Sequence, residues 1–135
     1  MIEERLQSDI VVKFSQLYPK KRGQLFHPSN ERNSTKQAFR AKAIGIVSGV
    51  ADLILFDKII GNVATELKCL DSRHKRKHIE SQVAWGKIWE SQGGTWRLCR
   101  TINEAIHCYQ GKPDGLTIYQ VEQMLVDQKT KTIRF

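Results

Sequence analysis

Long apolar runs, a signal sequence and internal repeats are all missing from this chain of 135 residues. No apolar stretch approaches the roughly 20 residues that a bilayer-spanning helix needs. The first residues, from Met1 to Arg5, have neither the basic start nor the apolar centre of a signal peptide. We therefore expect a cytoplasmic protein that does not associate with a membrane.

Cysteine is scarce, and the motifs of nucleophilic catalysis are missing. Cys69, Cys99 and Cys108 are widely spaced and include no C-x-x-C pair, which argues against a zinc knuckle or a redox centre. These cysteines are expected to be reduced and buried. Neither a G-x-S-x-G motif nor a glycine-rich phosphate loop occurs, so nucleophilic catalysis by serine or cysteine has no support.

The composition is that of a single globular domain with a strong positive charge. Hydrophobic residues make up 40% of the chain and charged residues 27%, which is enough apolar material for a core. We therefore treat residues 1–135 as one domain. The 22 Lys and Arg residues outnumber the 14 Asp and Glu residues, for a net charge of +8. Such a surplus favours a polyanionic partner, and nucleic acid is the leading one.

Hydrophobic periodicity and turn residues divide the chain into helices and strands. The predicted helices span 2–17, from Ser34 or Thr35 to Ala43, about 73–92, 101–109 and 117–127. The predicted strands span 50–56 and 63–70, which should pair antiparallel, and 95–100, with a short strand at 25–26 and a tail or edge strand over 129–135. This order describes an α/β fold with a small mixed sheet flanked by helices.

Three charged residues interrupt the two runs that otherwise read as buried strands. Residues two apart on a strand project from the same face, so Glu66 and Lys68 should point the same way. Asp52 lies between apolar residues, where a solitary carboxylate is costly to bury. Two carboxylates that converge from paired strands can hold Mg²⁺, which prefers oxygen ligands and retains several waters. The alternative from spacing alone is a buried ion pair between Asp52 and Lys68, with Glu66 facing solvent.

A cluster of basic residues follows these strands directly. Arg73, Lys75, Arg76 and Lys77 occupy the start of the long predicted helix. Such a run is often only a solvated face. Beside a candidate metal site, and on a chain of net positive charge, it is better interpreted as a surface that contacts phosphate.

These residues resemble the signature of a nuclease superfamily. Asp52, with Glu66-x-Lys68 on the next strand, is similar to the motif of the PD-(D/E)XK nucleases. The longer string Gly49-Val50-Ala51-Asp52-Leu53, Glu66-Leu67-Lys68 and Gln82-x-x-Trp85 resembles the virus-type replication-repair nuclease domain (VRR-NUC), in a stand-alone phage or bacterial form. The resemblance covers about residues 2–109 and leaves the helical segment 114–128 unmatched. Ala51 stands where the superfamily has proline, a residue that ligates nothing.

The resemblance implies a PD-(D/E)XK core, similar to restriction endonucleases, and a role for each matching residue. Asp52 and Glu66 would bind Mg²⁺ or Mn²⁺, Lys68 would be the catalytic lysine, and Gln82 would support the site from the following helix. Glu3, or alternatively Glu4, matches the acidic residue of the first helix. His27 and Asn30, in a His-Pro-x-Asn-Glu stretch, would contact the substrate or organise the site, or else form only a turn.

The implied activity is hydrolysis of phosphodiester bonds in branched double-stranded DNA. A homodimer would place two sites symmetrically on a four-way (Holliday) junction, in the cytoplasm of a bacterial or phage-infected cell. One alternative is a flap or nick endonuclease. Another is a basic module that binds branched DNA without cutting it.

Overall fold

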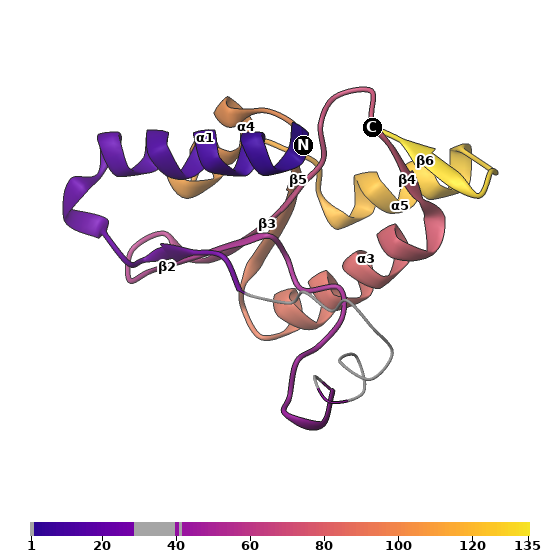
Figure 1. The fold of residues 1–135 in the computed structure, drawn as a ribbon, viewed down its shortest axis with the longest axis horizontal. Helices are drawn as coiled ribbons and strands as arrows, with labels where there is room; N and C mark the ends of the chain where they lie inside the picture. Colours follow the sequence, from indigo (N-terminus) through magenta and orange to yellow (C-terminus); the bar gives the residue numbers. More distant parts are fainter. Residues whose placement is uncertain (1, 29–39, 41) are drawn as a thin grey trace.

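The structure, a computed structural model, describes residues 2–28, 40 and 42–135 (Figure 1). Its helices are α1 (Ile2–Leu17), the 3-10 turn η1 (Pro19–Lys21), α3 (Arg76–Ser91), α4 (Ile102–Tyr109) and α5 (Ile118–Asp127). Its strands are β1 (Leu25–Phe26), β2 (Leu53–Asp57), β3 (Gly61–Leu67), β4 (Arg73–Lys75), β5 (Thr95–Cys99) and β6 (Thr132–Arg134). The predicted helix that ends at Ala43 lies largely outside the described residues.

A mixed sheet of four strands, in the order β1-β2-β3-β5, forms the centre of the fold. The pairs β1/β2 and β2/β3 are antiparallel, as predicted for the two β-prone runs, whereas β3 and β5 are parallel. Helix α3 makes the crossover that a parallel pair requires. The prediction of a small mixed sheet flanked by helices is confirmed.

Helices cover both faces of this sheet, and each face has its own core. Helices α1 and α4 lie on one side and α3 and α5 on the other (Figure 1). Ile10 and Phe14 of α1 pack with Tyr109 of α4 against the first face. Trp96 of β5, which is fully buried, packs with Val83 of α3 against the second. The central strand β3 is therefore buried on both faces.

Threonine side chains cap the last two helices. The Thr101 hydroxyl accepts a hydrogen bond from the Glu104 backbone N–H at 3.1 Å, and α4 begins at the next residue. Thr117 and Gln120 bond reciprocally at the start of α5 in a complete capping box. The predicted boundaries of both helices, and of α1, are confirmed to within one residue.

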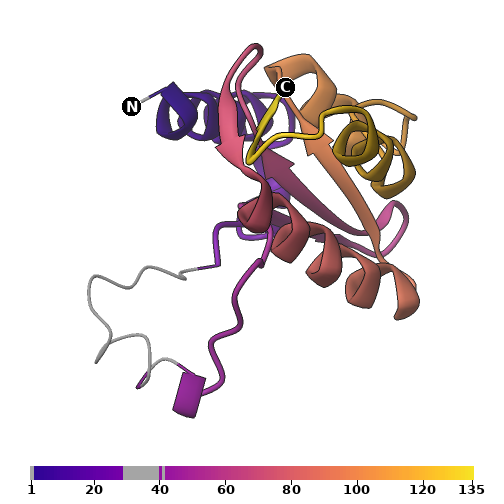
Figure 2. The ribbon, with the colours of Figure 1, turned by 90° about the vertical axis from the view of Figure 1, so that its right-hand side faces the viewer.

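The predicted start of the long helix is wrong by three residues. Arg73, His74 and Lys75 form strand β4, which pairs antiparallel with β6 to make a separate two-stranded sheet. Helix α3 therefore begins at Arg76. Figure 2 shows this pair of strands at the side of the molecule, near the start of α1. Strand β2 also begins later than predicted, at Leu53, because Val50 to Asp52 precede the ladder.

The helices of residues 2–28, 40 and 42–135 are all too short or too polar to traverse a bilayer.

Candidate functional site

Strand β3 holds Glu66, and Lys68 follows it on the same face. Ala64, on that face, packs into the core beneath α3, whereas Val63 and Leu67 pack into the opposite core. Thr65 also points to the opposite side, where its hydroxyl bonds to that of Tyr109 at 2.6 Å. The alternation predicted from the sequence is therefore confirmed.

Asp52 lies directly opposite Glu66. The β2/β3 register pairs Leu53 with Thr65. Because the strands are antiparallel, Asp52, which precedes Leu53, lies beside Glu66, which follows Thr65. The Asp52 carboxylate accepts a hydrogen bond from the Leu67 backbone N–H at 2.8 Å, and its negative charge raises the pKa of the Glu66 carboxyl group. The two acids thus converge from neighbouring segments, as predicted.

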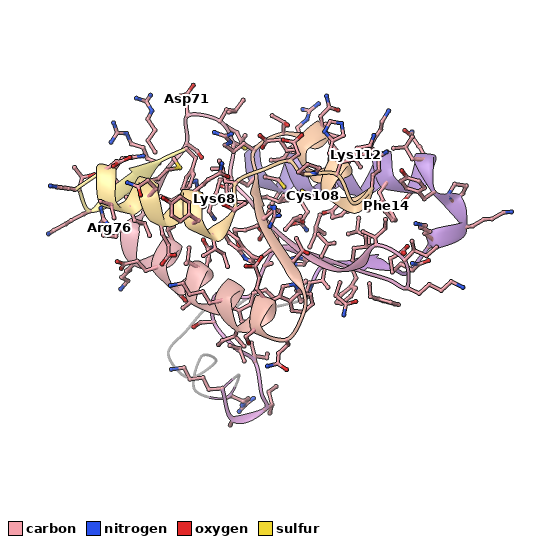
Figure 3. All side chains as sticks on the ribbon, turned by 180° about the vertical axis from the view of Figure 1, so that it is seen from behind. Phe14, Lys68, Asp71, Arg76, Cys108 and Lys112 are labelled. Atoms are coloured by element: carbon pink, nitrogen blue, oxygen red, sulfur yellow. The ribbon has the colours of Figure 1, made fainter. Side chains whose placement is uncertain are left out.

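Lys68 is bound to carboxylates rather than to solvent. Its Nζ lies 3.1 Å from Glu66 Oε2 and 3.9 Å from Glu3 Oε1, and only 5% of the residue is exposed. Glu66 is 1% exposed. The alternative of an Asp52–Lys68 ion pair with Glu66 in solvent is therefore wrong. Figure 3 shows Lys68 well inside the molecule.

The site holds more negative than positive charge. Burial, followed by the Asp52 charge, raises the pKa of Glu66 well above its usual range, although Lys68 acts in the opposite direction. Burial also raises the pKa of Glu3. Burial alone would lower the pKa of the Lys68 ammonium, but the charges of Glu66, Asp52 and Glu3 outweigh that effect and raise it. Three acids thus share one ammonium, and a bound cation would favour the ionised forms of the two whose pKa is raised.

The first turn of α1 brings Glu3 to the site together with a residue that sequence reasoning missed. Glu3 Oε2 lies 3.3 Å from His74 Nε2, which also bonds to the Ser72 hydroxyl at 2.8 Å. Glu4 is exposed, so Glu3 is the acid of this helix that faces the site. His74 would have been found by alternation along β4, had that segment been recognised as a strand.

Two buried side-chain oxygen atoms, one in the site and one on the helix that follows it, have no hydrogen-bond partner. They are Oε1 of Glu66, on β3, and Oε1 of Gln82, on α3. A buried acceptor left without a partner is costly, and a hydrated divalent cation would satisfy such oxygens. Among the described residues, no three His, Cys, Asp or Glu side chains form a metal cage by themselves. The two carboxylates of Asp52 and Glu66 are of the kind that binds Mg²⁺ or Mn²⁺, ions that need only one or two carboxylates and keep several waters.

Comparisons with known proteins found no match. No family model matches the chain, and neither the curated proteins nor the solved structures contain a significant match. The case for a function therefore depends on the residues and their geometry.

A close contact between α3 and the preceding loop positions Asp52. Gly49 has a φ of +83°, and a Cβ added to it would lie 2.5 Å from the Ser81 carbonyl oxygen. Only glycine combines this backbone conformation with such close packing. The imidazole Nδ1 of His27 bonds to the Asp52 carbonyl oxygen at 2.6 Å. His27 thus helps to organise the loop, while Asn30 lies outside the described residues.

The four predicted DNA-binding basic residues have different surroundings. Arg73, Lys75 and Lys77 are exposed. The Arg76 guanidinium instead donates hydrogen bonds to the carbonyl oxygens of Thr130 and Leu125, both at 2.9 Å, and to that of Gln128. Figure 3 shows Arg76 beside the C-terminal segment. We therefore assign Arg76 a structural role instead of the predicted phosphate contact.

Proposed function

We propose that this protein is a Mg²⁺- or Mn²⁺-dependent endonuclease that hydrolyses phosphodiester bonds in branched DNA. The observation that carries the proposal is the convergence of Asp52, Glu66 and Lys68, with a buried Glu66 oxygen that lacks a partner. A protein that only binds DNA has no use for buried acids that repel phosphate.

The arrangement of the sheet supports a PD-(D/E)XK core. The acid that precedes β2 and the Glu-x-Lys at the end of β3 meet at one end of the strands, and the helix that carries Gln82 comes next in the chain, in the order that the VRR-NUC resemblance implies. Glu3 reaches this end from the first helix. We therefore assign residues 1–135 to one nuclease domain of this type.

The proposed reaction is attack of water on phosphorus, with loss of the sugar oxygen. A divalent cation held by Asp52 and Glu66 would polarise a phosphate oxygen and stabilise the leaving oxygen. Lys68 stays protonated because three carboxylates surround it, so it donates hydrogen bonds and offsets the negative charge that builds up on the phosphate. Gln82 orients a water from the opposite wall of the site, and Glu3 holds the lysine in place.

The proposed substrate is a four-way junction, cut by a homodimer. One site cannot cut two strands symmetrically, whereas a two-fold dimer presents two equivalent sites. Light scattering at micromolar concentration tests this proposal, with an expected mass of twice 15.6 kDa. A monomer that stays monomeric on four-way DNA would instead favour a flap or nick endonuclease.

The decisive experiment is a cleavage assay on junction, flap, nicked and linear DNA with Mg²⁺, Mn²⁺ or a chelator. Asp52→Ala and Glu66→Ala should each abolish cleavage and leave DNA binding intact or tighter. Glu80→Ala is the matched control, because Glu80 is an exposed acid on α3 and its loss should change nothing. Cleavage retained by either site variant would overturn the assignment. Binding without cleavage on every DNA and metal would favour the non-cleaving module.

A further inference from the structure

The two-stranded sheet of β4 and β6 carries basic residues on its outer face. Its register pairs Arg73 with Arg134, His74 with Ile133 and Lys75 with Thr132. Ile133 is fully buried and His74 half-buried, so these two form the inner face. The outer face carries Arg73, Lys75 and Arg134, all exposed. We call this outer face the basic ribbon.

We propose that the basic ribbon binds the phosphate backbone of double-stranded DNA and so holds the DNA next to the site. This inference rests on the proposed nuclease function and adds a surface from the C-terminal segment, which the family resemblance leaves unmatched. Three cations from two strands that are far apart in the sequence share one small face. Asp71, whose carboxylate lies 3.8 Å from Arg134 Nε, is the acidic neighbour. Both side chains are largely exposed, so this ion pair is weak and phosphate can replace it.

The C-terminal strand is held in place by many hydrogen bonds. The Arg76 guanidinium bonds to three carbonyl oxygens from the last turn of α5 to the loop before β6, and the Arg76 backbone N–H bonds to the Lys131 carbonyl at 2.8 Å. The Gln128 side chain bonds to both the N–H and the carbonyl of Arg134. The Phe135 N–H bonds to the Ser72 carbonyl at 2.9 Å. A strand fixed in this way presents its cations without a large ordering cost on binding.

The inner face of the two-stranded sheet borders the site. His74 lies between Arg73 and Lys75 and contacts Glu3, which in turn lies 3.9 Å from Lys68. The outer face and its cations are therefore separated from the site by the thickness of this two-stranded sheet. The negative charge inside the site favours cation binding, whereas the positive charge beside the site favours phosphate binding.

A matched pair of double variants tests the ribbon. Lys75→Gln with Arg134→Gln removes two charges from it. Lys58→Gln with Lys112→Gln removes two exposed charges elsewhere: Lys58 lies in the β2–β3 turn, at the opposite end of these strands from Asp52 and Glu66, and Lys112 follows α4. Binding to duplex and four-way DNA is measured by fluorescence anisotropy in chelator, over a range of salt concentrations. Thermal unfolding establishes that both variants remain folded.

In a plot of log affinity against log salt concentration, the slope for the ribbon variant should be about 1.8 smaller in magnitude than the wild-type slope. Each lost contact with a duplex phosphate contributes about 0.9, and the variant loses two. At 0.1 M salt this corresponds to a loss of affinity of up to about 60-fold. The control variant should keep the wild-type slope. An unchanged slope in the ribbon variant, or an equal loss in the control, would overturn the inference. If the ribbon variant binds DNA more weakly but the wild type cleaves no DNA, only the proposed nuclease activity is refuted. If the wild type cleaves DNA and the ribbon variant binds DNA normally, only the proposed role of the ribbon is refuted.

Discussion

Replacing Glu66 by glutamine should make the protein more stable without metal and insensitive to metal. The buried Glu66 carboxyl has a raised pKa, a repulsive neighbour in Asp52 and an oxygen without a partner. A glutamine amide donates to Asp52 while its oxygen still accepts from Lys68. Because a buried polar group without a partner costs about 1–3 kcal/mol, Glu66→Gln should gain about that much free energy of unfolding in chelator.

These free energies translate into measurable melting temperatures. Unfolding entropies near 2.1 cal/mol/K per residue give about 0.28 kcal/mol/K for 135 residues, so about 1 kcal/mol shifts the midpoint by roughly 3.5 °C. In chelator, Glu66→Gln should therefore melt about 4–10 °C above the wild type. A cation at 100 times its dissociation constant adds about 2.7 kcal/mol. Mg²⁺ at that level should raise the wild-type midpoint by about 10 °C and leave the variant unchanged.

Scanning calorimetry with and without Mg²⁺ provides the measurement, and Glu80→Gln serves as the exposed-acid control. Equal Mg²⁺ shifts in the wild type and in Glu66→Gln would refute the reasoning, because the cation would then bind elsewhere. A variant that melts below the wild type in chelator would also refute it, since the Glu66 carboxylate would then be stabilising the fold as part of an ion pair.

Two further predictions concern the fold, one at the β2–β3 turn far from the site and one at Gly49 beside it. Hydrogen bonds from Lys21 and from the N–H groups of Ile60 and Ile59 hold the pKa of Asp57 well below its usual 3.8. The ionised Asp57 carboxylate therefore stabilises the fold above about pH 4, and this stabilisation is lost as the pH falls toward the pKa of Asp57 in the folded protein. Asp57→Asn should therefore melt below the wild type at pH 7, and the gap should narrow as the pH is lowered below 4; a constant gap would contradict this cause. Gly49→Ala should cost at least about 2 kcal/mol in urea unfolding, and more than Gly45→Ala, whose φ of +93° is similar but whose added Cβ would meet nothing within 4 Å.

Local pattern was sufficient to predict much of the fold and the centre of the candidate site. The apolar spacing that places Ile10 and Phe14 on one face predicted α1 with its observed bounds. Strand alternation predicted that Glu66 and Lys68 share a face, and antiparallel pairing predicted that Asp52 lies near them. These features depend on residues close in the sequence, or on one hairpin.

What the sequence did not disclose depends on contacts between distant segments. Strand β4 looks like the basic first turn of a helix, and only its pairing with β6 makes it a strand. The same pairing turns Arg76 from a phosphate-binding candidate into a donor to distant carbonyl groups. His74 enters the site through that strand. The role of Gly49 depends on how α3 passes over the loop. No local pattern encodes these arrangements.

The two-sided burial of β3 limits how the site could change during evolution. A shift of one residue in this strand would turn Glu66 into the core beside Tyr109 and bring Thr65 to the site. Mutation of β3 is therefore constrained on both faces at once. Glu3, His74 and Gln82 come instead from a helix start, a peripheral strand and a helix face. New substrate or metal preferences would arise most readily at these three positions, where a side chain can be exchanged without altering the central sheet.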